Sequence, residues 1–165
     1  MNATGEFYLA CIAHDRMKET MIDCLARHRH QLIHRPIIAT GTTGRLIRDR
    51  LGLEVKCMQS GPLGGDQQIG SKIACGKVGA VIFLRDPLYA HPHEPDIMAF
   101  LRLCDVHFVP LATNPATAEL LLANLPRIFG APPGPARSRL TAVGTSADVV
   151  AGTAVSASAG MAAAP

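Results

Sequence analysis

Four polar segments of the sequence hold the residues whose types could do chemistry. In chain order they are His14-Asp15 with Lys18, the run Thr-Gly-Thr-Thr-Gly at 40–44, the run Ser-Gly-Pro-Leu-Gly-Gly-Asp-Gln-Gln at 60–68, and Asp86-Pro87-Leu88 followed by His-Glu-Pro-Asp at 93–96. Carboxylate and imidazole groups can transfer protons, whereas lysine, hydroxyl and backbone N–H groups can bind a phosphate. The combination indicates a phosphate site with a proton-transfer group beside it.

The run at 40–44 has the composition of an anion-binding turn between a strand and a helix. Its glycines let the backbone approach an anion, while free N–H groups and threonine hydroxyls at the helix start can hydrogen-bond phosphate oxygens. It is neither a Walker loop nor the dinucleotide fingerprint, and a turn with a threonine N-cap is the simpler local explanation. Ser60 and Gly61 add donors and Lys18 adds a positive charge, so the segments together favour phosphate.

Two acidic positions have more than one interpretation. Asp66 follows two glycines at a predicted helix start, where it is either an N-cap or, beside a bound phosphate, a general base that removes a proton from carbon next to a carbonyl. The segment 91–96 (His-Pro-His-Glu-Pro-Asp) matches no standard zinc spacing. It is either a rigid loop that caps a helix, a metal site, or the source of a histidine that polarises a substrate carbonyl.

Short apolar runs that end in polar loops alternate with segments of helical periodicity. The predicted strands are 7–13, 33–39, 54–58, 80–84 and 106–110, and the predicted helices are 16–30, 43–50, 66–75, 95–103 and 116–122. This order favours an α/β fold with a mainly parallel sheet covered by helices. Ligands of such folds bind beyond the carboxyl ends of the strands. We therefore expect the four polar segments to share one crevice.

Charge and cysteine content exclude several classes of protein. The net charge of +3 is mild and the basic residues are spread along the chain, so nucleic acid is not an expected partner. Arginines and histidines gather between positions 27 and 35, which we interpret as a solvated helix end. The five cysteines form no Cys-x-x-Cys pair and are interpreted as small buried side chains. The sequence shows neither a signal peptide nor a membrane-spanning run, so cytoplasm is the expected location.

The composition changes near Gly130, after which Ala, Gly, Pro, Ser and Thr dominate. We predict one domain at 1–130 and a disordered tail at 131–165. A helical tail that docks on a neighbouring subunit is the alternative.

The four polar segments, in this order and spacing, resemble the methylglyoxal synthase family from about Phe7 to Leu122. The run that ends Gly-Gly-Asp-Gln-Gln at 64–68 is the most specific part of the resemblance. It implies a three-layer, flavodoxin-like α/β fold, a cytoplasmic homohexamer, and no metal or organic cofactor. The implied reaction eliminates phosphate from dihydroxyacetone phosphate through an enediolate to give methylglyoxal, a bypass of glycolysis. Inorganic phosphate is the implied product and a possible regulator.

The resemblance also implies roles for individual residues. Asp66 is the implied base, His93 the group that faces the carbonyl oxygen, and Arg102 a residue of intersubunit communication. Other implied catalytic residues are Asp96, Asp86, His14 and Asp15, and the implied binding residues are His14, Lys18, Thr40, Gly41, Thr42, Thr43, Ser60, Gly61 and His93.

Two departures from the family and two rival functions accompany this prediction. The alanine-rich end after Gly130 does not match the family's C-terminal segment, and Arg85 stands where the family has an aromatic residue. An allosteric effector domain could use the same fold to bind phosphate-bearing ligands without reaction, although Asp66, His93 and Asp96 together argue against it. A sugar-phosphate isomerase is the enzyme alternative.

Overall fold

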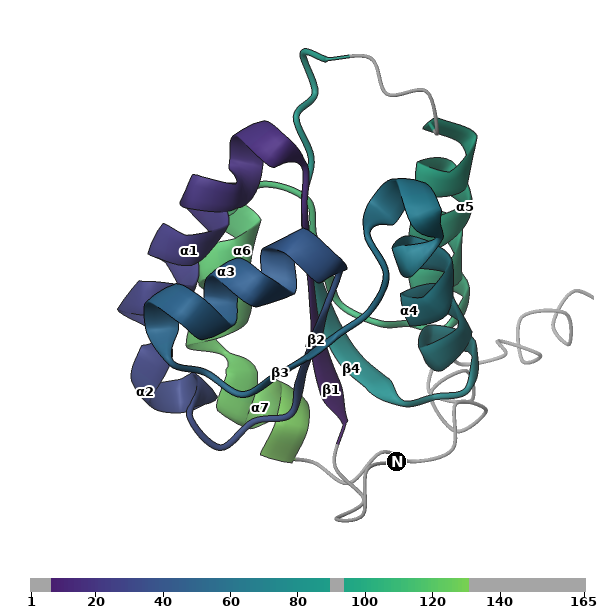
Figure 1. Cartoon of the computed structure of the whole chain (residues 1–165). Helices are drawn as coiled ribbons and strands as arrows, with labels where there is room; N and C mark the ends of the chain where they lie inside the picture. Colours follow the sequence, from purple (N-terminus) through teal and green to yellow (C-terminus); the bar gives the residue numbers. More distant parts are fainter. Residues whose placement is uncertain (1–6, 90–93, 131–165) are drawn as a thin grey trace, which may run out of the picture. The chain divides into compact units, whose positions relative to one another are not determined.

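A parallel sheet forms the centre of the fold, and helices cover both of its faces (Figure 1). The structure, a computed structural model, describes residues 7–89 and 94–130. Within them the strands are β1 (Tyr8–Ala13), β2 (Ile37–Ala39), β3 (Val55–Cys57), β4 (Val78–Leu84) and β5 (Leu111–Ala112). Their order is β3-β2-β1-β4-β5, and every neighbouring pair is parallel. The predicted three-layer α/β fold is therefore confirmed.

The helices divide between the two faces of the sheet (Figure 1). One face carries α1 (Lys18–Arg27), α2 (Arg29–Leu32), α3 (Gly41–Leu51), α6 (Pro115–Ala123) and α7 (Leu125–Gly130), and the other carries α4 (Gly65–Ala74) and α5 (Glu94–Val106). Two short 3-10 helices, η1 (Asp15–Met17) and η2 (Gly61–Leu63), lead into α1 and α4. The predicted boundary at 130 and the predicted tail at 131–165 fall at or beyond the end of the described residues. That division into domains stays a prediction.

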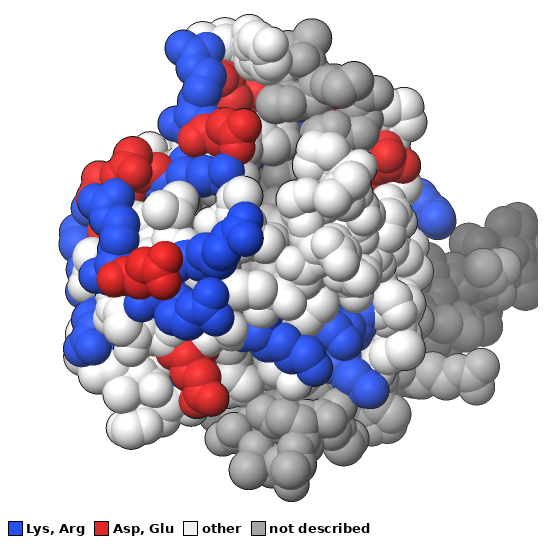
Figure 2. Space-filling view, in the orientation of Figure 1, with Lys and Arg blue, Asp and Glu red and all other residues white. Residues whose placement is uncertain are grey.

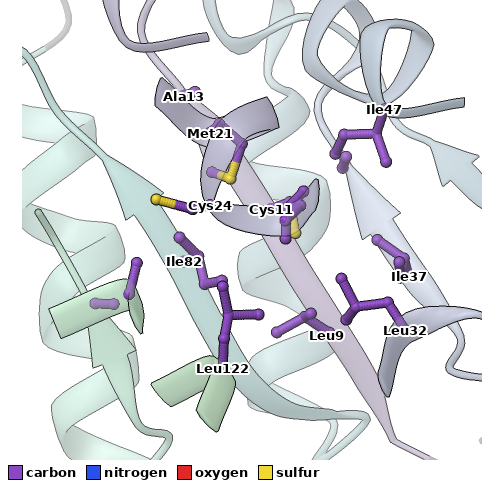
Figure 3. Packing of buried hydrophobic residues seen from close by; sticks show 14 of the residues in the cluster. Leu9, Cys11, Ala13, Met21, Cys24, Leu32, Ile37, Ile47, Ile82 and Leu122 are labelled. Carbon is purple, nitrogen blue, oxygen red and sulfur yellow. The ribbon is translucent and has the colours of Figure 1, made fainter. Parts of the chain in front are cut away.

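Alternation along β1 explains why both faces are covered. Leu9 and Cys11 join a buried cluster with α1, α3 and α6, part of which is shown in Figure 3, whereas Ala10 and Ile12 join a second cluster with α4 and α5. Successive side chains of a strand point to opposite faces. Each fully buried aliphatic side chain contributes about 1.5–3 kcal/mol, so two apolar faces hold the carboxyl ends of the strands in fixed positions.

The predicted strand at 106–110 is wrong. Helix α5 continues to Val106, and the chain then closes a C-terminal motif in which Phe108 adopts a φ of 53°. The N–H of Phe108 donates to the carbonyl of Asp105 and the N–H of Val109 donates to that of Cys104, which is the hydrogen-bond pattern of a Schellman motif. Glycine is usual at the left-handed position, so a phenylalanine there does not indicate the end of a helix. Strand β5 begins at Leu111 instead.

The first predicted helix and the second predicted strand also have different bounds. The helix predicted at 16–30 is interrupted at His28, which has a φ of −109° and separates α1 from α2. Helical turns then continue past Ile33, because the N–H of Ile33 donates to Arg29 and that of Arg35 to Leu32. Pro36 cannot continue these turns and favours an extended predecessor. Strand β2 therefore starts at Ile37 rather than at 33.

The basic segment at 27–35 is largely exposed, as expected of a solvated helix end, but it also contacts other elements. Arg27 donates to the carboxylate of Glu119 on α6, and Arg29 donates to the carbonyl of Leu51 at 2.7 Å. The guanidinium of Arg35 lies 4.8 Å from the ring centroid of Phe129. The contacts of this basic segment tie the end of α1 to α6, α3 and α7. Amino-acid composition alone cannot indicate them.

Charged side chains on the face drawn in Figure 2 lie mainly over α1, α2 and α3, where both signs are interspersed. The pair Arg50–Glu19, with an N–O distance of 2.7 Å, links α3 to α1 there. No helix in the described ranges is long and apolar enough to cross a membrane.

The cysteines only partly match the prediction of buried thiols. Cys11, Cys24 and Cys104 are buried, Cys57 is half-buried, and Cys75, at the C-terminal cap of α4, is exposed. Burial raises the pKa of Cys11 and of Cys104 to about 12. These thiols therefore stay protonated and pack as small apolar groups.

Candidate active site

A cavity of about 670 Å³ lies at the carboxyl ends of the central strands, where the strand order reverses between β1 and β4. Ligands of open α/β sheets bind at such switch points. The lining consists of Ile12, Ala13, His14, Asp15 and Arg16 from the end of β1 and η1, Thr40 and Thr42 after β2, Ser60, Gly61, Pro62 and Asp66 after β3, and Phe83, Asp86 and Tyr89 from β4 onward. Each of the four predicted polar segments contributes at least one described residue to it.

His14 is held by β4 and by an aromatic neighbour. The backbone N–H of Asp86 donates to its Nδ1 at 3.1 Å, and its ring packs edge-on against Phe83 with centroids 5.4 Å apart. Because Nδ1 accepts this hydrogen bond, the neutral ring carries its proton on Nε2. The imidazole therefore offers a donor rather than a base at Nε2.

Asp86 joins this arrangement through its carboxylate. Its Oδ1 accepts the N–H of Leu88 at 3.1 Å, and its Oδ2 lies 3.4 Å from a guanidinium nitrogen of Arg16. The side chain of Asp86 is 10% exposed and that of Arg16 is 73% exposed. The carboxylate thus fixes the turn after β4, and the backbone N–H of Asp86 in this turn holds His14.

Asp66 is a buried carboxylate of the cavity, with 5% of its surface exposed. It stands in the first turn of α4, but the N-cap is Gly64, which has a φ of 84°. The capping role that we considered for Asp66 is therefore wrong. Its Oδ1 accepts the N–H of Gln67 at 2.8 Å, and no ion pair to it occurs among the described residues. The positive end of the helix dipole suits a carboxylate at this position.

Two neighbouring backbone loops present donors to the cavity. Thr40 is the N-cap of α3, and its hydroxyl lies 3.4 Å from that of Thr43. The N–H groups of Thr42 and Thr43 belong to the first helical turn, where they have no intrahelical acceptor. Ser60 caps η2 in the second loop. Hydroxyl and N–H donors at helix starts are suited to bind an anion.

Several residues selected from the sequence do not line the cavity. Lys18 donates to Asp15 at 2.5 Å, and Asp96 is exposed in the first turn of α5. Gly41 and Thr43 belong to the first turn of α3 but are absent from the lining. His93 lies outside the described residues. Half of the alternative metal site at 91–96, including both of its histidines, also lies outside the described residues. Within the described ranges no group of three or more metal-ligating side chains occurs.

Other lining residues were missed by the sequence analysis. Arg16 lies between His14-Asp15 and Lys18, and Tyr89 follows Asp86 by three residues. Their positions in loops that directly follow strands are a signal that could have found them. Pro62 was quoted within its motif but was given no role.

Comparison with known proteins agrees with this geometry. Residues 20–113 match the sequence profile of the MGS-like domain family. The chain is 57% identical to the methylglyoxal synthase of Thermoanaerobacter sp. (strain X514) over 117 residues, which is 71% of this chain and 89% of that protein. It is 59% identical to the methylglyoxal synthase of Caldicellulosiruptor saccharolyticus over 119 residues, 72% of this chain and 84% of that protein.

A solved structure gives the same result. The crystal structure of methylglyoxal synthase from Elizabethkingia anophelis NUHP1 superposes with a TM-score of 0.67 and 46% sequence identity, covering 72% of this chain and 78% of that chain. The family profile spans the lining residues from Thr40 to Tyr89. This chain belongs to the methylglyoxal synthase family.

Proposed function

We propose that this protein converts dihydroxyacetone phosphate into methylglyoxal and inorganic phosphate, as a carbon–oxygen lyase. One observation carries the proposal beyond family membership. The buried carboxylate of Asp66 shares a cavity with the donor loops that start at Thr40 and Ser60. A base beside an anion site is the arrangement that proton removal from a phosphorylated ketose requires.

The phosphate of the substrate is bound by the two loops. Thr40, Thr42, Ser60 and Gly61 contribute hydroxyl and backbone N–H donors from the cavity lining, and Gly41 and Thr43 complete the first turn of α3. Lys18, now paired with Asp15 at the rim, supplies a positive charge to the dianion. Several donors fixed on helix starts hold the phosphate in one orientation.

Asp66 is the general base. Its carboxylate takes a proton from the hydroxymethyl carbon, and the C–H electron pair moves to form the enediolate with negative charge on the former carbonyl oxygen. His14 offers its Nε2–H as a donor, and His93, with Asp96 near it in the sequence, is the proposed electrophile at the carbonyl. Asp86 holds His14 through its backbone N–H, and Asp15 pairs with Lys18.

Elimination then completes the reaction. The hydroxyl proton on the former hydroxymethyl carbon first passes to the former carbonyl oxygen, and the oxygen that lost it forms the aldehyde carbonyl. The double bond of the enediolate shifts to the carbon that bears the phosphate, the C–O bond to phosphate breaks, and the phosphate leaves with that electron pair. Protonation of the released enol at its methylene carbon gives methylglyoxal. The phosphate grip must hold the breaking C–O bond perpendicular to the enediolate plane, so the donor loops choose between elimination and isomerisation.

The test is to incubate the purified protein with dihydroxyacetone phosphate and to measure inorganic phosphate and methylglyoxal together. We expect equimolar release of both, and loss of both in the Asp66→Asn variant. Formation of glyceraldehyde 3-phosphate without phosphate release would identify an isomerase instead. Saturable binding of phosphate or a nucleotide without turnover would identify an effector-binding module.

We further propose that the protein works in the cytoplasm as a homohexamer and that its product phosphate competes with substrate. Leu63, Leu88 and Tyr89 are 72%, 92% and 61% exposed beside the cavity lining, and exposed apolar groups of this size favour a subunit contact. Light scattering on the purified protein tests the hexamer, and a monomeric mass would reject it. Steady-state inhibition by phosphate tests the competition.

A further inference from the structure

The segment Gln59-Ser60 leads into the second donor loop and is hydrogen-bonded to the starts of α3 and α4. The N–H of Gly41, at the start of α3, donates to the carbonyl of Gln59 at 3.0 Å. The N–H of Gly65, at the start of α4, donates to the carbonyl of Ser60 at 3.0 Å. The spacing between the two loops is therefore set by the position of this one segment.

A side chain from α4 holds the segment at its remaining backbone donor. The sheet ladder ends where the N–H of Met58 donates to Ala39 at 2.8 Å, so the N–H of Gln59 has no strand partner. Gln68 replaces that partner, because its Oε1 accepts the N–H of Gln59 at 2.9 Å. The donor is a backbone N–H, so the oxygen of the amide, not its nitrogen, must face Gln59.

Close packing adds a steric constraint on the same segment. A Cβ atom at Gly65 would lie 1.9 Å from the carbonyl oxygen of Gln59, a distance that no real contact allows. A Cβ at Gly41 would lie 3.1 Å from the carbonyl oxygen of Met58. Both helix starts thus approach the segment as closely as backbone can, and small shifts of the segment move Ser60 and Gly61 relative to Thr42.

We propose that Gln68 is a positioning residue for the phosphate site, acting through the backbone of Gln59 to hold the two donor loops in register. The proposal rests on the proposed function of the cavity. Gln68 does not line the cavity itself, and its amide can act on a bound anion only through this segment. Asp66 is held by α4 and by its neighbouring N–H, so the base should be affected less than the phosphate grip.

The experiment compares Gln68→Leu, which removes the acceptor, with Gln68→Glu, which retains a carboxylate oxygen as acceptor. Ser71 lies on the same helix and borders the same shallow groove as Gln68, so Ser71→Leu and Ser71→Glu are controls for the added apolar surface and the added charge. Inorganic phosphate is titrated by calorimetry, and the KM and kcat for dihydroxyacetone phosphate are measured on the same preparations.

For Gln68→Leu we expect the Kd of phosphate and the KM to rise about three- to tenfold relative to Ser71→Leu, the effect of one lost hydrogen bond. We expect kcat and the melting temperature to match those of the control. Gln68→Glu should bind phosphate as Ser71→Glu does. Equal phosphate affinities of Gln68→Leu and Ser71→Leu, or a Gln68→Glu variant as weak as Gln68→Leu, would overturn the proposal.

The same measurements separate this proposal from the proposed function. If the unaltered protein releases no methylglyoxal, the lyase assignment fails whatever the variants do. If it releases methylglyoxal and binds phosphate but Gln68→Leu is unaltered in both, only the positioning role fails.

Discussion

Two carboxylates of this molecule differ in the groups that compensate their negative charge. Asp66 at the cavity is buried and accepts a backbone N–H, with no cation paired to it in the described part of the chain. Glu119 on α6, by contrast, receives hydrogen bonds from Arg27 and His28 of α1. An acid that is not neutralised by a partner remains available to react, whereas the paired acid joins two helices.

Replacing Asp66 by asparagine should have the largest effect and tests the first half of this contrast. The amide keeps the shape but cannot take a proton, so we expect kcat to fall about 10²–10⁴-fold, the range for a lost general base. Phosphate affinity and melting temperature should change little. Steady-state kinetics checks the first expectation and calorimetry the second. Unaltered turnover would end the assignment of Asp66 as the base and with it the contrast.

Two glycines of α4 extend the comparison to packing, because the backbone at the cavity end of this helix lies directly against the backbone of Gln59. In Gly65→Ala the new Cβ must displace the carbonyl of Gln59, so we expect a loss of about 1–3 kcal/mol in the free energy of unfolding together with lower activity. The matched control is Gly70→Ala, whose Cβ would lie 3.1 Å from the flexible end of Leu103.

Denaturant unfolding of both variants measures this difference. Gly70→Ala should be close to neutral, since Leu103 can give way and alanine favours a helix by about 1 kcal/mol over glycine. Equal free energies of unfolding for the two variants would mean that the close approach at Gly65 does not constrain the fold.

Lys18 combines the two situations. It forms an ion pair with Asp15, as Arg27 does with Glu119, but Asp15 lines the cavity that holds Asp66. If it binds the phosphate dianion, Lys18→Ala should raise the Kd of inorganic phosphate about tenfold, the effect of one lost charge-assisted hydrogen bond. Lys72→Ala removes the same charge from the outer side of α4 and serves as the control. A phosphate affinity equal to that of the control would exclude Lys18 from the phosphate site, and its role would be limited to the ion pair with Asp15.

Much of the cavity could be predicted because its signals are local. A buried strand followed at once by a polar, glycine-rich loop marks a carboxyl end, and parallel strands bring such ends together. His14, Thr40, Ser60 and Asp66 meet for this reason. The rim residue Arg16 has no such mark, because an exposed arginine in a loop looks the same whether or not it borders a cavity.

Features that depend on distant contacts could not be predicted. Arg27 and Glu119 are 92 residues apart, so the interpretation of a solvated helix end had no means of including their pair. The strand predicted at 106–110 failed for a different reason, since apolar composition cannot reveal that Phe108 takes a left-handed conformation and closes α5. The position of the segment Gln59-Ser60 likewise depends on three elements at once.

Glu119→Gln should have the smallest effect and tests the second half of the contrast. Hydrogen bonds from Arg27 and then from His28 lower the pKa of Glu119 from 4.5 to about 2. The side chain is 35% exposed, so we expect a cost of only about 0.5–1 kcal/mol in the free energy of unfolding near neutral pH. Turnover should be unaltered, because Glu119 does not line the cavity.

The pH dependence of this cost distinguishes a charge effect from simple packing. A carboxyl whose pKa is lowered by folding adds stability above its unfolded pKa, and that stability is lost as the pH falls through the folded pKa. The difference between the unaltered protein and Glu119→Gln should therefore be full above pH 4.5 and shrink as the pH falls toward 2. High salt should also reduce it, since exposed ion pairs are screened. A difference that is constant with pH and salt would mean that Glu119 joins α1 to α6 by shape, and that the charge contrast with Asp66 does not hold.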